Sequence, residues 1–237
     1  MSTPGKSNDL HFLPLMLAAL GVVVFLGGLI LGSRYLRSSG LMASHEAVIS
    51  KLQSPFENPH GYIVASSAVA ICGALMLPVV RSVFLGLREA GGMASITSVI
   101  SGIGSLLLAL GFLGEIALGC LTRLWSMYDQ AHIVLAFATL IAIAAGLALC
   151  LALAARLRGN YGLLLLAAVQ LLAVATLIYM VFNPNFPPER SFLTSLAFLE
   201  WLLCLSFIVS LLALVASVTF PPFNDLKSGA SPDPATQ

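Results

Sequence analysis

The sequence predicts an all-α fold, namely a polytopic membrane protein built as a six-transmembrane-helix bundle. Hydrophobic residues make up 59% of the 237-residue chain, charged residues make up 9%, and the mean hydropathy is +0.99. A soluble domain of this size cannot hide so much apolar surface. The apolar residues also gather into stretches of roughly 20 residues, the length at which a helix crosses about 30 Å of hydrocarbon. The six predicted spans are Leu13 to Gly32, Tyr62 to Leu85, Ile96 to Leu121, His132 to Ala155, Tyr161 to Phe182 and Leu193 to Phe220.

The first span is predicted to be a retained anchor and not a cleaved signal peptide. It is too long for the apolar region of a signal, and Gly32-Ser33-Arg34 follows it where a small-x-small cleavage site would stand. Residues 1–12 are therefore predicted to form a cytoplasmic N-terminal tail. The transmembrane domain is predicted to cover residues 13–220.

One long extracytoplasmic loop, residues 33–61, follows the first span. Within it, Met42 to Leu52 gathers its apolar side chains on one helical face, which is typical of a short helix lying at the membrane interface. Pro55 and Pro59 then end this helix and direct the chain back into the bilayer. The loop is either an ordinary connection or a lid over a cavity.

Glycines predict close packing of the first and third spans. Gly28 and Gly32 form a GxxxG pair, and the third span carries Gly104, Gly111 and Gly119 at spacings that share a face. Glu115 lies four residues from each of the latter two glycines. We therefore expect its side chain to face a neighbouring helix and not lipid.

The end of the chain holds a turn and a polar tail. Asn183 to Pro188 is rich in proline and cannot be helical, so it is predicted to form a rigid turn between the last two spans. Residues 221–237 are rich in Pro, Ser, Asp and Ala and are predicted to be a disordered cytoplasmic tail.

Basic residues decide the predicted topology. An even number of spans puts both termini on one side, and Arg81/Arg88 and Arg156/Arg158 then flank two short connections on that side. Short loops weigh most in the positive-inside rule. We therefore predict a multi-pass protein of the cell inner (cytoplasmic) membrane, with both termini cytoplasmic.

Two glutamates inside apolar spans are the best sequence indication of a functional site. An ionisable side chain at the centre of a membrane helix costs roughly 2.5–3.5 kcal/mol and is usually kept for a partner or a function. At 1.5 Å per residue, Glu115 lies ~9 Å and Glu200 ~10 Å from the outer ends of their spans. Their matching depths predict a shared site near the outer face. Each glutamate also has a purely structural interpretation, as an acid that fastens two helices.

Four other polar residues complete the predicted ligand-binding set. His132 opens the fourth span and His60 precedes the second, so both are placed at the outer mouth. Asp129, three residues before His132, is predicted to cap that helix and orient the imidazole. Gln170 lies deeper in the fifth span and is predicted to line the floor of the pocket.

Several chemistries lack a signature in this chain. The four cysteines form no CxxC pair and are predicted to be small buried hydrophobes, and the sequence holds neither an HExxH zinc motif nor a GxSxG nucleophile motif. We therefore predict no metal and no cofactor, and assign no catalytic residue. A net charge of +1 gives no basic face for nucleic acid. The predicted partners are membrane lipids and a small-molecule or lipid ligand, and homo-oligomerisation is left open.

Four short stretches resemble a known family. Ile49-Ser50-Lys51-Leu52, Asn58-Pro59-His60-Gly61, the helix led by His132 and the stretch Leu199-Glu200-Trp201 are similar to the six-span prokaryotic integral membrane proteins of the DUF 998 family, which are related in layout to the FRAG/DRAM/Sfk membrane proteins. The resemblance covers residues 13 to 217 and implies fold and topology only, because the family has no established activity. The chain departs from it in a longer first loop and in Glu115.

Together these features predict an integral membrane protein with an outward-facing polar pocket that binds or passes a small or lipidic molecule. Two other classes stay open. One is an intramembrane hydrolase or transferase that uses the paired carboxylates. The other is a non-catalytic structural or regulatory membrane subunit, so the sequence does not decide whether the protein is an enzyme.

Overall fold

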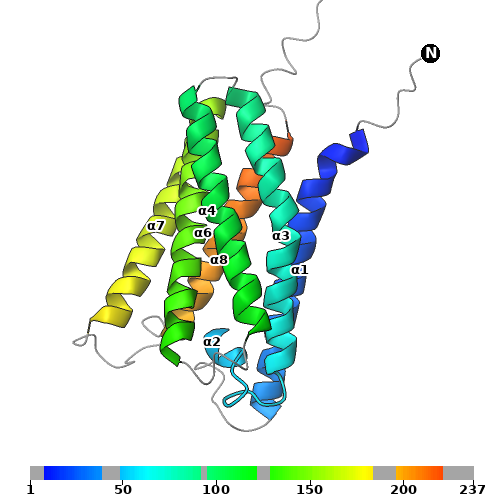
Figure 1. Cartoon of the computed structure of the whole chain (residues 1–237), viewed down its shortest axis with the longest axis vertical. Helices are drawn as coiled ribbons and strands as arrows, with labels where there is room; N and C mark the ends of the chain where they lie inside the picture. Colours follow the sequence, from blue (N-terminus) through cyan, green and yellow to red (C-terminus); the bar gives the residue numbers. More distant parts are fainter. Residues whose placement is uncertain (1–7, 39–48, 92–94, 122–128, 184–195, 221–237) are drawn as a thin grey trace, which may run out of the picture.

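The structure is a computed structural model that describes residues 8–38, 49–91, 95–121, 129–183 and 196–220. Over these ranges the chain forms helices and the turns that join them, with no strand (Figure 1). The helices are α1 (Asn8–Ser38), α2 (Ile49–Leu52), α3 (Tyr62–Gly91), α4 (Ser95–Cys120), α6 (Asp129–Arg158), α7 (Tyr161–Phe182) and α8 (Leu196–Thr219).

Five of these helices are long and apolar enough to cross a membrane, which confirms the prediction of a multi-pass helical membrane protein. They are α1, α3, α4, α6 and α8. The predicted fifth span coincides with α7. Among the described residues of α7, the apolar stretch Tyr161–Leu172 is shorter than the other five and is not counted with them. The structure therefore shows five spans and one additional apolar helix.

Helix α1 extends past both ends of the predicted first span. It begins at Asn8, within the predicted tail, and ends at Ser38, within the predicted loop. Its last turns stay helical because Leu36, beyond the predicted end at Gly32, is buried against the rest of the bundle.

The predicted interfacial helix is described only in part. Its described stretch is α2, which ends at Leu52, before Pro55 as expected. Residues 42–48, the predicted turn after Asn183 and the predicted tail at 221–237 lie outside the described residues.

The spanning helices form a ring. Helix α1 packs on α3, α3 on α4, α4 on α6, α6 on α8, and α8 closes the ring on α1. Helix α7 lies outside it, against α6 and α8 (Figure 1). The rings of Phe12 and Phe220, with centroids 5.7 Å apart, join the start of α1 to the chain just after α8. The first and last helices therefore have these ends on the same side of the bundle.

Small residues let the ring close tightly. A β-carbon on Gly32 would lie 3.0 Å from the β-carbon of Ala65, and Gly28 likewise faces Ala68, so the GxxxG pair packs α1 on α3 as predicted. The glycines of α4 do not share one partner. Gly111 faces Ile143 of α6, whereas Gly119 faces α3. The reason is geometric, because eight residues turn a helix by about 80° beyond two full turns.

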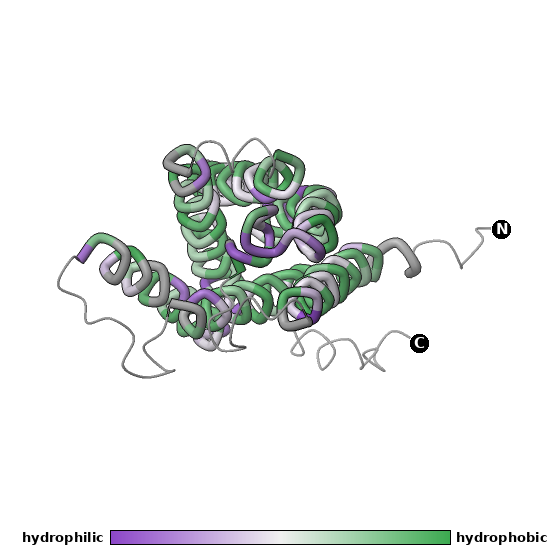
Figure 2. Tube along the Cα trace, turned by 90° about the horizontal axis from the view of Figure 1, so that it is seen from below, coloured by the Kyte–Doolittle hydropathy of each residue, from purple (hydrophilic) through white to green (hydrophobic). Residues whose placement is uncertain are grey.

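One end of the ring is covered by α2 and the segment 53–61. In Figure 2, which looks at that end, a hydrophilic stretch crosses the middle of mainly apolar helix walls. Helix α2 contacts α1, α3 and α8, which are three consecutive helices of the ring. We call α2 together with residues 53–61 the roof.

Asn58 holds the roof onto the bundle. Its side-chain amide donates to the carbonyl oxygens of Gly32 (3.2 Å) and Leu52 (2.9 Å), and its side-chain oxygen accepts from the N–H of Gly61 (3.1 Å). A β-carbon on Gly61 would lie 2.7 Å from this amide group and 2.8 Å from the Gly32 oxygen. Only glycine therefore fits at position 61. The buried network ties the end of α1, the end of α2 and the start of α3 together.

Replacing Asn58 with alanine should destabilise the protein. The substitution leaves two buried carbonyl oxygens without this donor, and such losses cost about 1–3 kcal/mol. Thermal unfolding of the detergent-solubilised protein measures the effect. The neighbouring exposed residue provides the matched control, since His60→Ala should change the free energy of unfolding by less than about 0.5 kcal/mol. Equal losses in both variants would contradict the proposed anchoring role.

Candidate functional site

A cavity of about 110 Å³ lies inside the ring, beneath the roof. Such a space holds several water molecules or a small polar group. Every spanning helix of the ring contributes to its wall, and the roof contributes Ile49 and Gln53. The wall is formed by Phe25, Ile49, Gln53, Val69, Glu115, Leu118, His132, Ala136, Thr139, Leu140, Glu200, Leu203 and Cys204. We call it the outer cavity.

Three of the predicted site residues come together here. Glu115 from α4, Glu200 from α8 and His132 from α6 all line the outer cavity, although they lie far apart in the sequence. The two matching depths along α4 and α8 therefore correspond to one common space. The roof residues in the wall also place the first loop over this space, as the lid interpretation requires.

The other three predicted residues are placed differently. His60 is exposed and does not line the outer cavity. Asp129 is the first residue of α6, so it stands at the expected helix start, but its side chain lies outside the described residues. Gln170 is fully buried, yet it is not part of the cavity wall.

Gln170 is excluded from the wall because its helix lies outside the ring. Its side-chain nitrogen donates to the backbone oxygen of Ser206 on α8 at 2.9 Å. Gln170 therefore does not line the floor of the outer cavity, where the sequence had placed it. Gln170 instead fastens α7 to the outer side of α8.

Glu200 connects the cavity wall to the roof. One oxygen of its carboxyl group accepts a hydrogen bond of 2.7 Å from the backbone N–H of Ile49, the first residue of α2. The side chain of Ile49 is itself buried. Glu200 thus holds the start of the roof helix against α8, over a sequence separation of 151 residues.

Glu115 has a different environment. Its Oε2 atom is buried and has no hydrogen-bond partner among the residues that the structure describes. The same holds for Oε1 of Gln53 and Oγ1 of Thr139, whose residues are 7% and 5% exposed and line the same cavity. Buried polar atoms are nearly always paired, so three unpaired oxygens around one space leave hydrogen-bonding capacity there for water or for a ligand.

Two of these oxygens come from residues that sequence reasoning missed. Thr139 follows His132 by seven residues, two helical turns that return to the same face, and this spacing was the available signal. Gly114 of α4 faces the Thr139 side chain and leaves it room. Gln53 carried no comparable signal, because its position depends on how the roof folds back over the ring.

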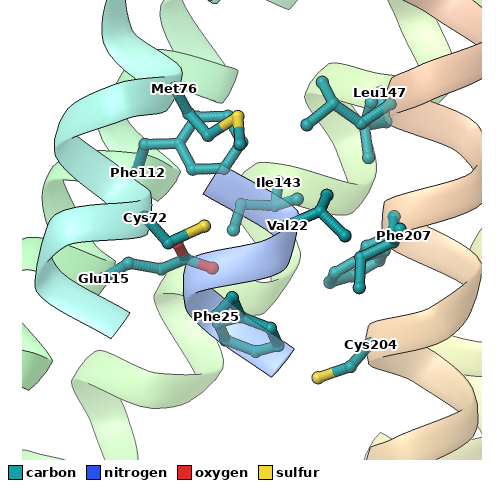
Figure 3. A pocket seen from close by; sticks show the side chains of 12 residues that line it. Val22, Phe25, Cys72, Met76, Phe112, Glu115, Ile143, Leu147, Cys204 and Phe207 are labelled. Atoms are coloured by element: carbon teal, nitrogen blue, oxygen red, sulfur yellow. The ribbon is translucent and has the colours of Figure 1, made fainter. Parts of the chain in front are cut away.

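A second cavity of about 50 Å³ continues from the first toward the middle of the bundle. Figure 3 shows the Glu115 side chain reaching into this space, into which Phe25 of α1 and Cys204 of α8 also point. These three residues line both cavities. Apart from Glu115, the walls of this inner cavity are formed by apolar and sulfur-containing side chains, among them Met76, Phe207 and Ile208.

The two cavities differ in the chemistry of their walls. The outer cavity presents carboxyl, amide and hydroxyl oxygens, and its described wall holds no lysine or arginine to neutralise the two glutamates. Across the described part of the chain, no three His, Cys, Asp or Glu side chains are grouped as metal ligands would be. Such an arrangement favours a ligand that donates hydrogen bonds.

No protein-family model, curated protein or solved structure matches this chain. The geometry of the cavities is therefore the basis for assigning a function.

Glu200→Ala should loosen the roof. The variant removes the acceptor of the Ile49 N–H, and a hydrogen bond to a carboxylate is worth about 1.5–3 kcal/mol. Hydrogen exchange of the Ile49 amide should accelerate by roughly ten- to a hundredfold, as followed by mass spectrometry of overlapping peptides that begin several residues before Ile49 and extend into the roof. Glu89→Ala, at an exposed position near the other end of α3, should leave that exchange unchanged. If the exchange rate of the Ile49 amide were unchanged in Glu200→Ala, the Glu200 carboxyl group would not hold the roof.

Proposed function

We propose that this protein binds or passes a small or lipidic molecule in an outward-facing pocket of the membrane. The observation that supports this proposal is the outer cavity, in which Glu115, Glu200 and His132 meet beneath a roof. Three buried oxygens in its wall lack partners among the described residues, so the folded chain leaves hydrogen-bonding capacity for a guest.

In this proposal the two glutamates have separate roles. Glu115 is the polar anchor for the ligand, because one of its oxygens is buried and unpaired at the junction of the two cavities. Glu200 keeps the roof closed through the Ile49 N–H. His132 lies beside them in the wall, on the first turns of α6.

Two alternatives receive less support from the contacts. A purely structural role for Glu115 predicts that its carboxyl group is fully paired within the bundle, whereas Oε2 has no partner in the described part of the chain. Catalysis by paired carboxylates requires both groups to reach the same substrate. One carboxyl oxygen of Glu200 already accepts a hydrogen bond from the N–H of Ile49 in the roof, so this contact favours a structural role for Glu200 over a catalytic one.

The proposed topology has six passes, with α7 as the sixth membrane-crossing helix. The resemblance of four short sequence stretches to the DUF 998 proteins implies this layout. Both termini are proposed to be cytoplasmic, in the prokaryotic inner membrane, so that the roof faces outward. The support is the placement of Arg88 and Arg156 near the ends of helices opposite the roof.

Glu115→Gln should lose the ligand while keeping the fold. The amide keeps the size of the side chain but replaces one acceptor oxygen with a donor group. We expect a molecule that co-purifies with the wild-type protein in mild detergent to fall at least tenfold in the variant, as measured by untargeted mass spectrometry. Thr139→Val should lower retention too.

Glu89→Gln is the matched control, because this exposed glutamate is far from the cavity, and it should retain the ligand at the wild-type level. Size-exclusion profiles show whether each variant stays folded. If Glu115→Gln retained every co-purifying molecule, Glu115 would not be the ligand anchor. If the variant lost the ligand only because it no longer folded, the role of Glu115 would be to fasten helices.

The topology can be tested with single cysteines. A cysteine that reports on the roof has to be exposed. Phe56 is 74% exposed, whereas Gln53 in the same segment is buried, so we place the cysteine at position 56. With the exposed native thiol removed by Cys120→Ser, Phe56→Cys should react with a membrane-impermeant maleimide on intact cells. Tyr161→Cys, at an 82% exposed position at the other end of the bundle, should react only after lysis. The reverse pattern would invert the topology.

A further inference from the structure

The two cavities adjoin each other and have different linings. They share Phe25, Glu115 and Cys204, so the junction between them lies at the level of Glu115. The outer end holds the unpaired oxygens, and the inner end is apolar beyond Glu115. A molecule that fills both ends has to be amphipathic, with its polar group beneath the roof.

The charges of the outer cavity specify the polar group further. Its described wall holds two carboxyl groups, no lysine or arginine, and His132 as its basic side chain. Buried charges are stable in a protein only when they are paired. A cationic guest therefore complements this cavity, whereas an anionic guest would meet two carboxyl groups and no lysine or arginine.

The unpaired atoms match a protonated primary amine. Glu115 Oε2, Gln53 Oε1 and Thr139 Oγ1 are three oxygens able to accept hydrogen bonds. An ammonium group offers three donors and no acceptor. A carboxylic acid or a phosphate would instead present further acceptors to these atoms.

The inner cavity limits the apolar part of the guest. On α8 its wall runs from Cys204 to Leu211, about 10 Å along the helix axis at 1.5 Å per residue. Its volume of about 50 Å³ suits the end of one narrow chain and excludes the paired chains of a phospholipid. The guest is thus short and single-chained.

Building on the proposed function, we infer that the ligand is a single-chain amphipathic amine. Its ammonium group lies among Glu115, Gln53 and Thr139, and its alkyl chain passes Phe25 into the inner cavity between α3 and α8. The inference names the ligand class and adds a second compartment to the proposed pocket.

A photoreactive amine tests this placement. Full-length protein in phosphatidylcholine nanodiscs is irradiated with octylamine that carries a diazirine on its last carbon, and the labelled peptides are mapped by mass spectrometry. Label is expected on the inner-cavity residues Met76, Phe207 or Ile208. Excess octylamine should reduce this label at least fivefold, and equal concentrations of octanoate or octanol should leave it within twofold. Competition by octanoate or octanol as strong as by octylamine would overturn the amine assignment.

A pair of adjacent substitutions tests the use of the inner cavity. Ile208→Phe fills the cavity and should reduce the label at least tenfold. Val209→Phe adds the same ring at a 53% exposed position on the same helix and should behave as wild type. Because the competition experiment uses the unaltered protein, the inference remains testable even if Ile208→Phe does not fold.

Other outcomes separate this inference from the proposed function. If phosphatidylethanolamine in the nanodiscs competed as well as octylamine, the ammonium would belong to a two-chain lipid and the single-chain inference would fail. A second outcome is that Glu115→Gln loses a co-purified molecule while the photoreactive octylamine leaves no label in the inner cavity of the wild-type protein. That result would support the proposed binding pocket and overturn the assignment of an amine ligand. Equal labelling at Val209 and Ile208 would show only partition into the surrounding lipid, and would overturn the inference.

Discussion

A carboxyl group within a membrane-spanning helix has to be satisfied inside the protein, because hydrocarbon offers it no hydrogen bonds. This constraint organises the end of the bundle that the roof covers. Glu200 satisfies it with the N–H of Ile49, and this bond brings a segment from the first loop onto the last helix. The roof in turn creates an enclosed space next to Glu115, where the same constraint is met only in part.

The roof depends on two attachments that reinforce each other. Asn58 fixes its end to α1 and to the start of α3, while Glu200 fixes its beginning to α8. Between these points Leu52 is completely buried, so the segment is packed as well as hydrogen-bonded. The roof is thus held at both ends, by the Asn58 amide on the carbonyl oxygen of Gly32 and by the Ile49 N–H on the carboxyl group of Glu200.

Close helix packing sets the size of the cavity. Gly28 lets α1 approach α3, and Gly111 lets α4 approach α6. An apolar inner end and a polar outer end then follow from which side chains face inward at each depth. The bundle thus combines a rigid wall with a local excess of hydrogen-bond acceptors.

The sequence by itself determined the helical membrane fold, the positions of the main helices and the similar depths of Glu115 and Glu200. These features are local, since span length and the rise per residue fix how far each side chain lies along its own helix. Only the tertiary structure decided which side chains meet. It placed α7 outside the ring and so removed Gln170 from the pocket, it left His60 exposed, and it brought in Gln53 and Thr139. Lateral neighbours depend on contacts between residues far apart in the chain, such as Ile49 with Glu200, and no single stretch of sequence specifies such a contact.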